Sequence, residues 1–453
     1  MRVRVHVPPD SASAGLTLVA RRAGADAFTL VAAVCMAGGA RLAVADANIN
    51  PYGTVTVEHN SNVFGRPDYA PPLASSGIYG FGDTIERYLA GVSGDYAWSQ
   101  ERLTLTAEGR HDDYDRFTPL NHNEYRLQGE LAWNITSLLG GTVSFRQAQY
   151  MAPLIDTLAT QISLNKEKIA SALVHMSLTP VWRIDLTPGV HELEAPLPPQ
   201  YPDFHLRDKS AAATLNYLGI SKLTAGLEVA YATGRYYGIV DATRFHTKSA
   251  SFRADYAVTG FSSFSLTLGY TQRSSSLTGQ FVSQPGLGVV NTAASVAGTT
   301  VGTTGSLSYR RNLSEKTAFT VRAFRDIQSY FAGANPEVET GGAFSLTWNP
   351  DIKFSFALDY TQTRQVIPGV QAITDFADRE DHSRHAALGV KYFAFSWLTV
   401  RPYLSYDKRD SNLALANYSA TMVGIDFAAR WLGPEQREVN PVGLPPVGSN
   451  SVN

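Results

Sequence analysis

Apolar and polar residues alternate strictly along many segments of about ten residues in this chain. In segment 125–134 (YRLQGELAWN), every second residue from Tyr125 to Trp133 is apolar or small, and Arg126 and Glu130 stand between them. Successive side chains of a β-strand point to opposite faces, so the pattern predicts strands with one apolar face and one wet face. The same phase recurs in segments 102–108, 222–231 and 353–360.

The alternating segments come in pairs joined by connections of two lengths. Short turns at one end and long loops at the other are the asymmetry of outer-membrane β-barrels. Short turns are expected near 99–100, 179–180, 219, 259–260, 312 and 349–351, and long connections near 60–84, 149–167, 188–207, 273–301 and 362–382. An opening strand near 54–58, hairpins starting near 85, 125, 168, 210, 249, 302, 341 and 385, and a closing strand ending at Trp431 predict about eighteen strands, with sixteen as the alternative.

A soluble β-sandwich also has strands with alternating apolar and polar residues, so the positions of aromatic residues are needed to distinguish it from a membrane barrel. Rings such as Trp98, Trp133 and Trp348 cap the apolar runs, as expected where amphipathic rings lie at a membrane interface. The opposite face carries charges of both signs, which a dry core would not tolerate. We therefore expect an all-β fold, a single transmembrane antiparallel β-barrel with a wet interior. The lumen-facing candidates are Arg102, Arg110, Arg126, Arg146, Arg183, Arg253, Arg310, Arg322, Arg401, Glu108, Glu130, Glu228, Asp255 and Asp359.

Composition removes several other classes of protein. A formal net charge of −2 argues against a nucleic-acid binder, whose footprint is strongly basic. The only cysteine, Cys35, lies in the predicted export signal, so we expect no disulfide, reactive thiol or cysteine-based metal site in the mature protein. We expect no cofactor, no metal and no catalytic residues.

The beginning of the chain has the features of an export signal. Arg21 and Arg22 precede the apolar run 28–37, and small-residue cleavage sites follow at 43–45 and 45–47. The alternative is a short buried core helix, because the run is too short to span a bilayer. We predict a signal peptide and leader at 1–47, the barrel at 48–432 and a disordered periplasmic tail at 433–453.

Short motifs spread over the chain resemble a known family. They are EHNSNVF at 58–64, LAGVSGDY at 89–96, QERL at 100–103, YDRF at 114–117, LN at 120–121, YRL at 125–127 and PVWR at 180–183. With them, the chain resembles the β-barrel outer-membrane proteins encoded in exopolysaccharide biosynthesis loci, of the EpsL type. The chain departs from common barrel endings, because a tail containing Pro and Gly follows Trp431.

The resemblance implies a barrel that assists exopolysaccharide export through its lumen, with polysaccharide and other export-machinery proteins as partners. Outer-membrane lipid is the partner that the barrel fold itself requires. Interior arginines could select the cargo, because guanidinium groups bind carboxylates and hydroxyl-rich chains; the alternative is lumen charge balanced by nearby acids. Two other functions stay open: a general diffusion porin, and a barrel enzyme, for which no converging catalytic set is found.

Three loop motifs are weaker candidates. HDDYD at 111–115 and DREDHSRH at 378–385 combine carboxylates and histidines, but neither has the spacing of a calcium loop, and charged exterior loops explain both. The glycines of QPGLG at 284–288 lack the flanking strand and helix of a phosphate cradle. They suggest a flexible loop that could fold inward as a constriction.

Overall fold

A computed structural model describes residues 47–67, 80–152, 154, 162–196, 204–237, 243–276, 298–329, 336–367 and 379–430. Residues 1–46 of the predicted signal peptide and leader, the loop motif 284–288, Trp431 and the predicted tail lie outside the described residues, whereas Ala47 begins the first strand. Among the described residues, no helix is long and apolar enough to cross a membrane.

The described chain consists of β-strands and two single-turn 3₁₀ helices, η1 (Thr118–Leu120) and η2 (Ala414–Ala416). The strands are β1 (Ala47–Asn60), β2 (Asp83–Trp98), β3 (Glu101–Tyr114), β4 (His122–Asn134), β5 (Leu139–Met151), β6 (Leu164–Thr179), β7 (Trp182–Ala195), β8 (Phe204–Ile220), β9 (Leu223–Tyr237), β10 (Thr243–Thr259), β11 (Ser262–Ser276), β12 (Gly298–Ser314), β13 (Thr317–Ser329), β14 (Pro336–Trp348), β15 (Phe354–Ile367), β16 (Arg379–Phe395), β17 (Leu398–Ser411) and β18 (Tyr418–Arg430).

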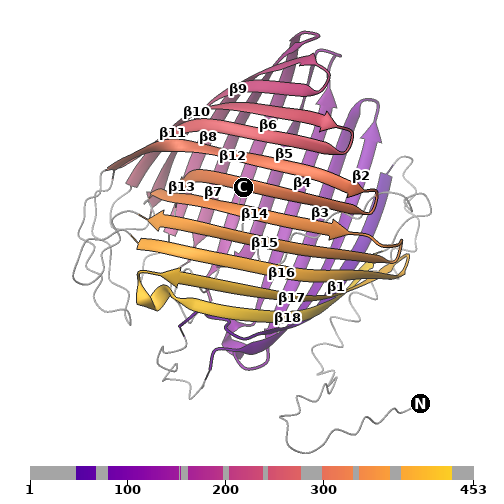
Figure 1. Ribbon diagram of the computed structural model, residues 1–453, viewed down its shortest axis with the longest axis vertical. Helices are drawn as coiled ribbons and strands as arrows, with labels where there is room; N and C mark the ends of the chain where they lie inside the picture. The colour runs from indigo at the N-terminus through magenta and orange to yellow at the C-terminus, as the bar shows by residue number, and fades with distance from the viewer. Residues whose placement is uncertain are drawn as a thin grey trace, which may run out of the picture. The chain divides into compact units, whose positions relative to one another are not determined.

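The strands form one closed antiparallel sheet, drawn in Figure 1. Each strand pairs with its neighbours in the chain, and β1 pairs with both β2 and β18. Gly53, for example, lies opposite Ala90 on one side and Ala429 on the other. The predicted fold is confirmed: the eight predicted hairpins correspond to β2–β3 through β16–β17, and the sheet has 18 strands.

Several predicted connections were displaced or shorter than expected, and three of them show why. The turns expected at Gly219 and Asn312 lie further along the chain, because β8 runs to Ile220 and β12 to Ser314. In both strands a register shift near the end lets the strand continue past the turn-forming residue. The loop expected from residue 188 begins after Ala195. Pro188, which has no N–H to donate, lies within β7. The pairing of β6 with β7 is interrupted around it, so no hydrogen bond from that position is needed.

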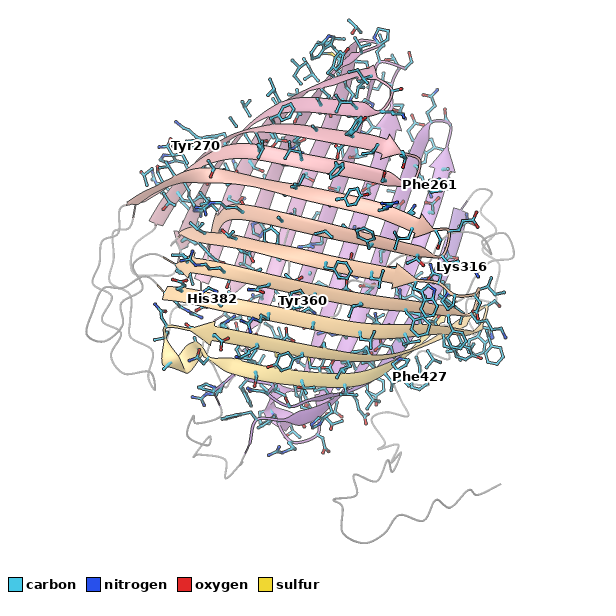
Figure 2. The ribbon with its side chains drawn as sticks, in the orientation of Figure 1. Phe261, Tyr270, Lys316, Tyr360, His382 and Phe427 are labelled. Atoms are coloured by element: carbon cyan, nitrogen blue, oxygen red, sulfur yellow. The ribbon has the colours of Figure 1, made fainter. Side chains whose placement is uncertain are left out.

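One face of the sheet is apolar and exposed. It includes Leu227, which is 63% exposed, with Leu105, Val143, Leu268, Leu307, Leu404 and Val423. Figure 2 shows Tyr360 and Phe427 on the outer side of the wall. At about 3.3 Å per residue and a tilt of about 40°, the outer stretch from Leu223 to Tyr231 spans roughly 20–25 Å along the barrel axis, close to the apolar band of a membrane barrel.

Aromatic rings border this apolar band at both ends. Near the short turns they stack in pairs, including Tyr96 on Trp98 at 5.3 Å between centroids and Phe264 on Tyr309 at 4.5 Å. Towards the long connections the outer rings are tyrosines: Tyr88, Tyr125, Tyr231, Tyr270, Tyr360 and Tyr406, which we call the tyrosine ring. The outer surface therefore has the layered order of a membrane-spanning barrel.

Candidate functional site: the inner wall of the barrel

The strand registers place all fourteen predicted lumen residues on one face of the sheet. Residues directly opposite each other on neighbouring strands share a face. Glu108 lies opposite Arg126, and Arg253 opposite Gly226, in phase with the rest of the set and out of phase with outward residues such as Leu105 and Leu227. That face encloses the barrel interior. Whether these residues select a cargo stays a prediction.

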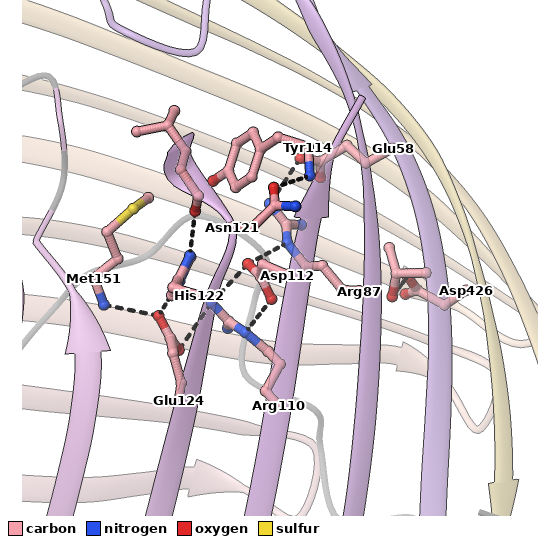
Figure 3. Close-up of polar contacts among 12 residues, drawn as sticks. Glu58, Arg87, Arg110, Asp112, Tyr114, Asn121, His122, Glu124, Met151 and Asp426 are labelled. Carbon is pink, nitrogen blue, oxygen red and sulfur yellow. Dashed lines mark hydrogen bonds and ion pairs between the residues drawn. The ribbon is translucent and has the colours of Figure 1, made fainter. Parts of the chain in front are cut away.

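A series of interior contacts crosses six strands. Figure 3 shows its central part. We call it the charge ladder: Arg401 and Tyr403 on β17, Asp426 on β18, Glu58 on β1, Arg87 on β2, Arg110 and Asp112 on β3, and His122 and Glu124 on β4.

Arg87 is at the centre of the ladder. Its Nη2 lies 3.0 Å from Glu58 Oε1, and its Nε lies 3.2 Å from Asp112 Oδ2. The side chains of Glu58 and Asp112 are only 1% and 2% exposed. Because a buried carboxylate without a counter-charge is very costly, the guanidinium that Glu58 and Asp112 share is a main reason why both acids can lie in the wall.

From Asp112, the charge ladder continues towards β4. Arg110 bridges Asp112 and Glu124, at 2.8 Å to each. His122 Nε2 lies 3.1 Å from Glu124, while its Nδ1 contacts the carbonyl oxygen of Leu120 at 2.7 Å. Arg87 and Arg110 thus each lie between two carboxylates, which compensates their charge within the wall.

Two tyrosines lie flat against the inner wall over glycines. Tyr403 on β17 lies opposite Gly424 on β18, which lies opposite Glu58 on β1. The Tyr403 hydroxyl donates to Glu58 Oε2 at 2.5 Å, across the intervening glycine. A Cβ at Gly424 would lie 2.5 Å from the tyrosine ring, so only glycine permits this close approach.

The same three-strand arrangement occurs again on the neighbouring strands. Tyr52 on β1 lies opposite Gly91 on β2, which lies opposite Glu108 on β3. The Tyr52 hydroxyl donates to Glu108 Oε1 at 2.6 Å, and a Cβ at Gly91 would lie 2.6 Å from its ring. Both tyrosines therefore follow the wall, which keeps large side chains out of the central space.

A second ion-paired series runs from β5 to β8. Arg146 Nη2 lies 2.5 Å from Glu167, and His191 lies between Glu167 at 3.2 Å and Asp208 at 2.9 Å. Glu167 is 3% exposed, so its two partners supply the compensation that burial requires. Arg146 is thus the predicted lumen residue that anchors this series.

Residues of the family-like motifs meet at the end of the barrel near the long connections. Phe64, Phe117 and Leu120 pack with the inward Ile85 and Tyr114 in a small buried cluster. The buried carboxylate of Asp83 accepts backbone N–H bonds from Arg116 and Phe117, each at 2.9 Å. The β3–β4 connection is therefore fixed onto the inner wall, which accounts structurally for the motifs at 58–64, 114–117 and 120–121.

The inner wall of β10 to β15 has a different composition from the charge ladder. In a closed ring of 18 strands, β10 to β15 lie across from β1 to β6. Their inward positions are rich in small hydroxyl side chains, which we call the hydroxyl wall: Thr247, Ser249, Ser251, Ser263, Ser265, Thr267, Thr271, Thr300, Thr304, Ser306, Ser308, Thr320, Ser345, Thr347, Ser355, Thr361 and Thr363.

Predicted lumen charges are spread among these hydroxyls. Arg253 forms an ion pair with Glu228 at 2.9 Å, and the Arg322 guanidinium lies 5.0 Å from the centre of the Phe324 ring. At the edge of the wall, Thr187, Ser210, Ala230, Ala232 and Ser249 line a shallow hollow of about 170 Å³. The described part of this side of the lumen therefore offers many small hydroxyl groups between fewer charged side chains.

Strand alternation divides the two weaker candidate clusters between opposite faces. Asp112 points inward to Arg87, whereas His111 points outward and contacts Asn123 at 2.8 Å. Asp381 lies inside with Arg379, whereas His382 lies outside with Glu380. The expectation that 111–115 and 378–385 form exterior loops was wrong, because β3 continues to Tyr114 and β16 begins at Arg379. Among the described residues, no group of three or more His, Cys, Asp or Glu could hold a metal ion.

The chain was compared with known proteins at three levels. No family model matches it, and no curated protein matches it. Similar solved structures include the FrpB iron transporter from Neisseria meningitidis (10% identity, TM-score 0.47, 80% of this chain and 62% of that chain). OpdK from Pseudomonas aeruginosa has 10% identity and a TM-score of 0.46, over 85% of this chain and 99% of that chain. OpdL from the same organism has 13% identity and a TM-score of 0.42, over 86% and 99%. The chain spans less than two thirds of FrpB, and identities this low assign it to none of these families.

Proposed function

We propose that this protein spans the outer membrane and passes an exopolysaccharide through its lumen by shape and weak polar contacts. Membrane placement is supported by the closed sheet, which has no unpaired edge, and by the apolar outer band between two aromatic zones. The long connections would face the exterior and the short turns the periplasm.

The hydroxyl wall is the observation that carries the polysaccharide proposal. A hydrated sugar chain presents many hydroxyl groups, each of which can exchange weak hydrogen bonds with serine, threonine and water. Conduction requires binding that is weak and spread over many sites, so that the cargo can also leave. Small side chains such as Ser265 and Thr267 satisfy this requirement better than long charged side chains would.

The ion-paired ladders favour a second candidate, a general diffusion porin. Arg87, Arg110 and Arg146 each contact acidic partners, so these arginines are compensated within the wall and would select ions only weakly. This candidate shares the membrane placement and differs only in cargo.

Conductance in planar bilayers distinguishes the two functions. For a polysaccharide conduit, we expect added purified exopolysaccharide to reduce ion current in a concentration-dependent way, with less effect from a compact oligosaccharide. A deletion strain should lose surface polysaccharide and regain it from a plasmid-borne copy. Unchanged surface polysaccharide together with reduced uptake of small solutes would reject the polysaccharide role and support the porin. Hydrolysis of a lipid or glycan panel by the refolded protein would instead support the enzyme alternative.

A further inference from the structure

We propose that a basic patch on the outer face of β8 to β10 binds the phosphate groups of an anionic glycolipid in the outer membrane leaflet. The patch consists of Arg207, Lys209, Arg235, Arg244, His246 and Lys248. This inference rests on the membrane placement in the proposed function and is independent of the cargo.

The core of the patch is a row of three arginines on neighbouring strands. Arg207 lies directly opposite Arg235, and Arg235 lies directly opposite Arg244. Directly opposite residues have Cβ atoms about 5 Å apart, and like charges in such positions are destabilising. An anion with several acceptor oxygens would turn this repulsion into charge-assisted hydrogen bonds, for which arginine geometry is well suited to phosphate.

The surrounding charges leave the patch positive. On the described outer face of β6 to β11 beyond the tyrosine ring, seven Lys and Arg stand against two acids, Glu192 and Glu194. Both acids lie on β7 opposite lysines of β6, and Glu192 also forms an ion pair with Arg207 at 2.9 Å. Five of the seven Lys and Arg stand on β8, β9 and β10.

The patch lies at the level expected for lipid headgroups. Tyr231 of the tyrosine ring precedes Arg235 on β9 and lies opposite Lys248 on β10. Figure 2 shows Tyr270, another member of the ring, near the end of the barrel with the long connections. Groups just beyond the interfacial aromatic rings meet headgroups rather than acyl chains.

On other strands, the outward residues beyond the tyrosine ring carry a different charge. Outward positions of β1 to β4 hold His59, Glu86, His111, Asp113 and Asn123, with no Lys or Arg among them. On β15 and β16, the outward Arg364 forms an ion pair with Glu380 at 2.6 Å. A phosphate-bearing lipid would therefore be held on one side of the barrel rather than uniformly around it.

Native mass spectrometry of the refolded full chain in detergent tests the proposal. The probes are diphosphoryl lipid A, its dephosphorylated form and phosphatidylglycerol. We expect diphosphoryl lipid A to bind preferentially, and R235S/R244S to lower its affinity on the order of tenfold. A second variant, K209S/K248S, should also weaken binding. The matched control R325S/R384S removes two arginines from the outer face of β13 and β16 and should bind as the parent does.

Heat-dependent gel mobility first establishes that each variant is folded. Equal binding of phosphatidylglycerol, equal loss in the control, or no binding of lipid A by the folded parent would each overturn the proposal. Bilayer conductance of the same preparations is measured separately. A barrel that conducts normally but does not bind lipid A would refute only the lipid site. A barrel that binds lipid A but does not conduct would refute only the proposed function.

Discussion

Tyr403 and Glu58, which are 345 residues apart in the sequence, are joined by a 2.5 Å hydrogen bond across the strand that closes the barrel. The bond spans Gly424 on β18 and therefore links β17 to β1 on the inner wall. Because β1 and β18 meet only when the sheet closes, this contact reports closure. It also holds a large ring flat against the wall instead of in the lumen.

Gly424→Ala should displace the Tyr403 ring, because the added Cβ would lie 2.5 Å from it. Overpacking together with the lost hydrogen bond should lower the free energy of unfolding by about 2–3 kcal/mol. Urea titration followed by heat-dependent gel mobility measures the change. Gly94→Ala is the matched control, since nothing lies within 4 Å of its Cβ position. Equal stability of the two variants would show that the ring has room to move.

Arg87→Met should destabilise the barrel more than Arg102→Met. It leaves Glu58 and Asp112 buried without their shared partner, which costs about 3–5 kcal/mol when one member of a buried pair is removed. Arg102→Met is the control, because Arg102 is 67% exposed in its pair with Asp95 and should contribute less than about 1 kcal/mol. Adding Glu58→Gln to Arg87→Met should restore part of the loss. Equal effects of the two arginine variants in urea titrations would refute a special role for Arg87.

The strand number and the two faces could be predicted from the sequence because both depend on a local period. Outward and inward residues such as Leu105 and Glu108 are distinguished by alternation alone, without knowledge of strand partners. The predicted opening strand at 54–58 was too short, and Asp112 was assigned to a loop. Their strands, β1 and β3, extend to Asn60 and Tyr114.

The charge ladder could not be predicted in the same way because it depends on register between distant segments. Glu58 and Arg87 are in the inward phase, which was a usable signal, but their contact requires the β1–β2 register across a long connection. The match of Thr56 with Asp426 requires closure of the whole ring. Alternation specifies which way a side chain points, and register specifies which side chain it meets.

Ser265→Trp should reduce polymer passage if the hydroxyl wall guides the cargo. Ser265 faces the lumen on β11, and an indole there would project a bulky apolar group from a wall of small hydroxyl side chains. We expect weaker current reduction by added exopolysaccharide and lower surface polysaccharide in the complemented strain. Leu266→Trp places the same ring on the lipid face of the next position and should leave both readouts unchanged. Identical behaviour of the two variants would mean that this part of the wall does not contact the cargo.

Leu227→Arg should disrupt membrane insertion, because Leu227 is 63% exposed on the outer face, midway between Leu223 and Tyr231. An arginine near the bilayer midplane of a barrel costs about 2–4 kcal/mol. Ala230→Arg on the same strand is the control, since Ala230 faces the wet interior and the cost there should be much smaller. Folding into vesicles, followed by urea titration, compares the two. Because one strand carries both substitutions and only the face differs, a larger loss for Ala230→Arg would reverse the assignment of the lipid and lumen faces.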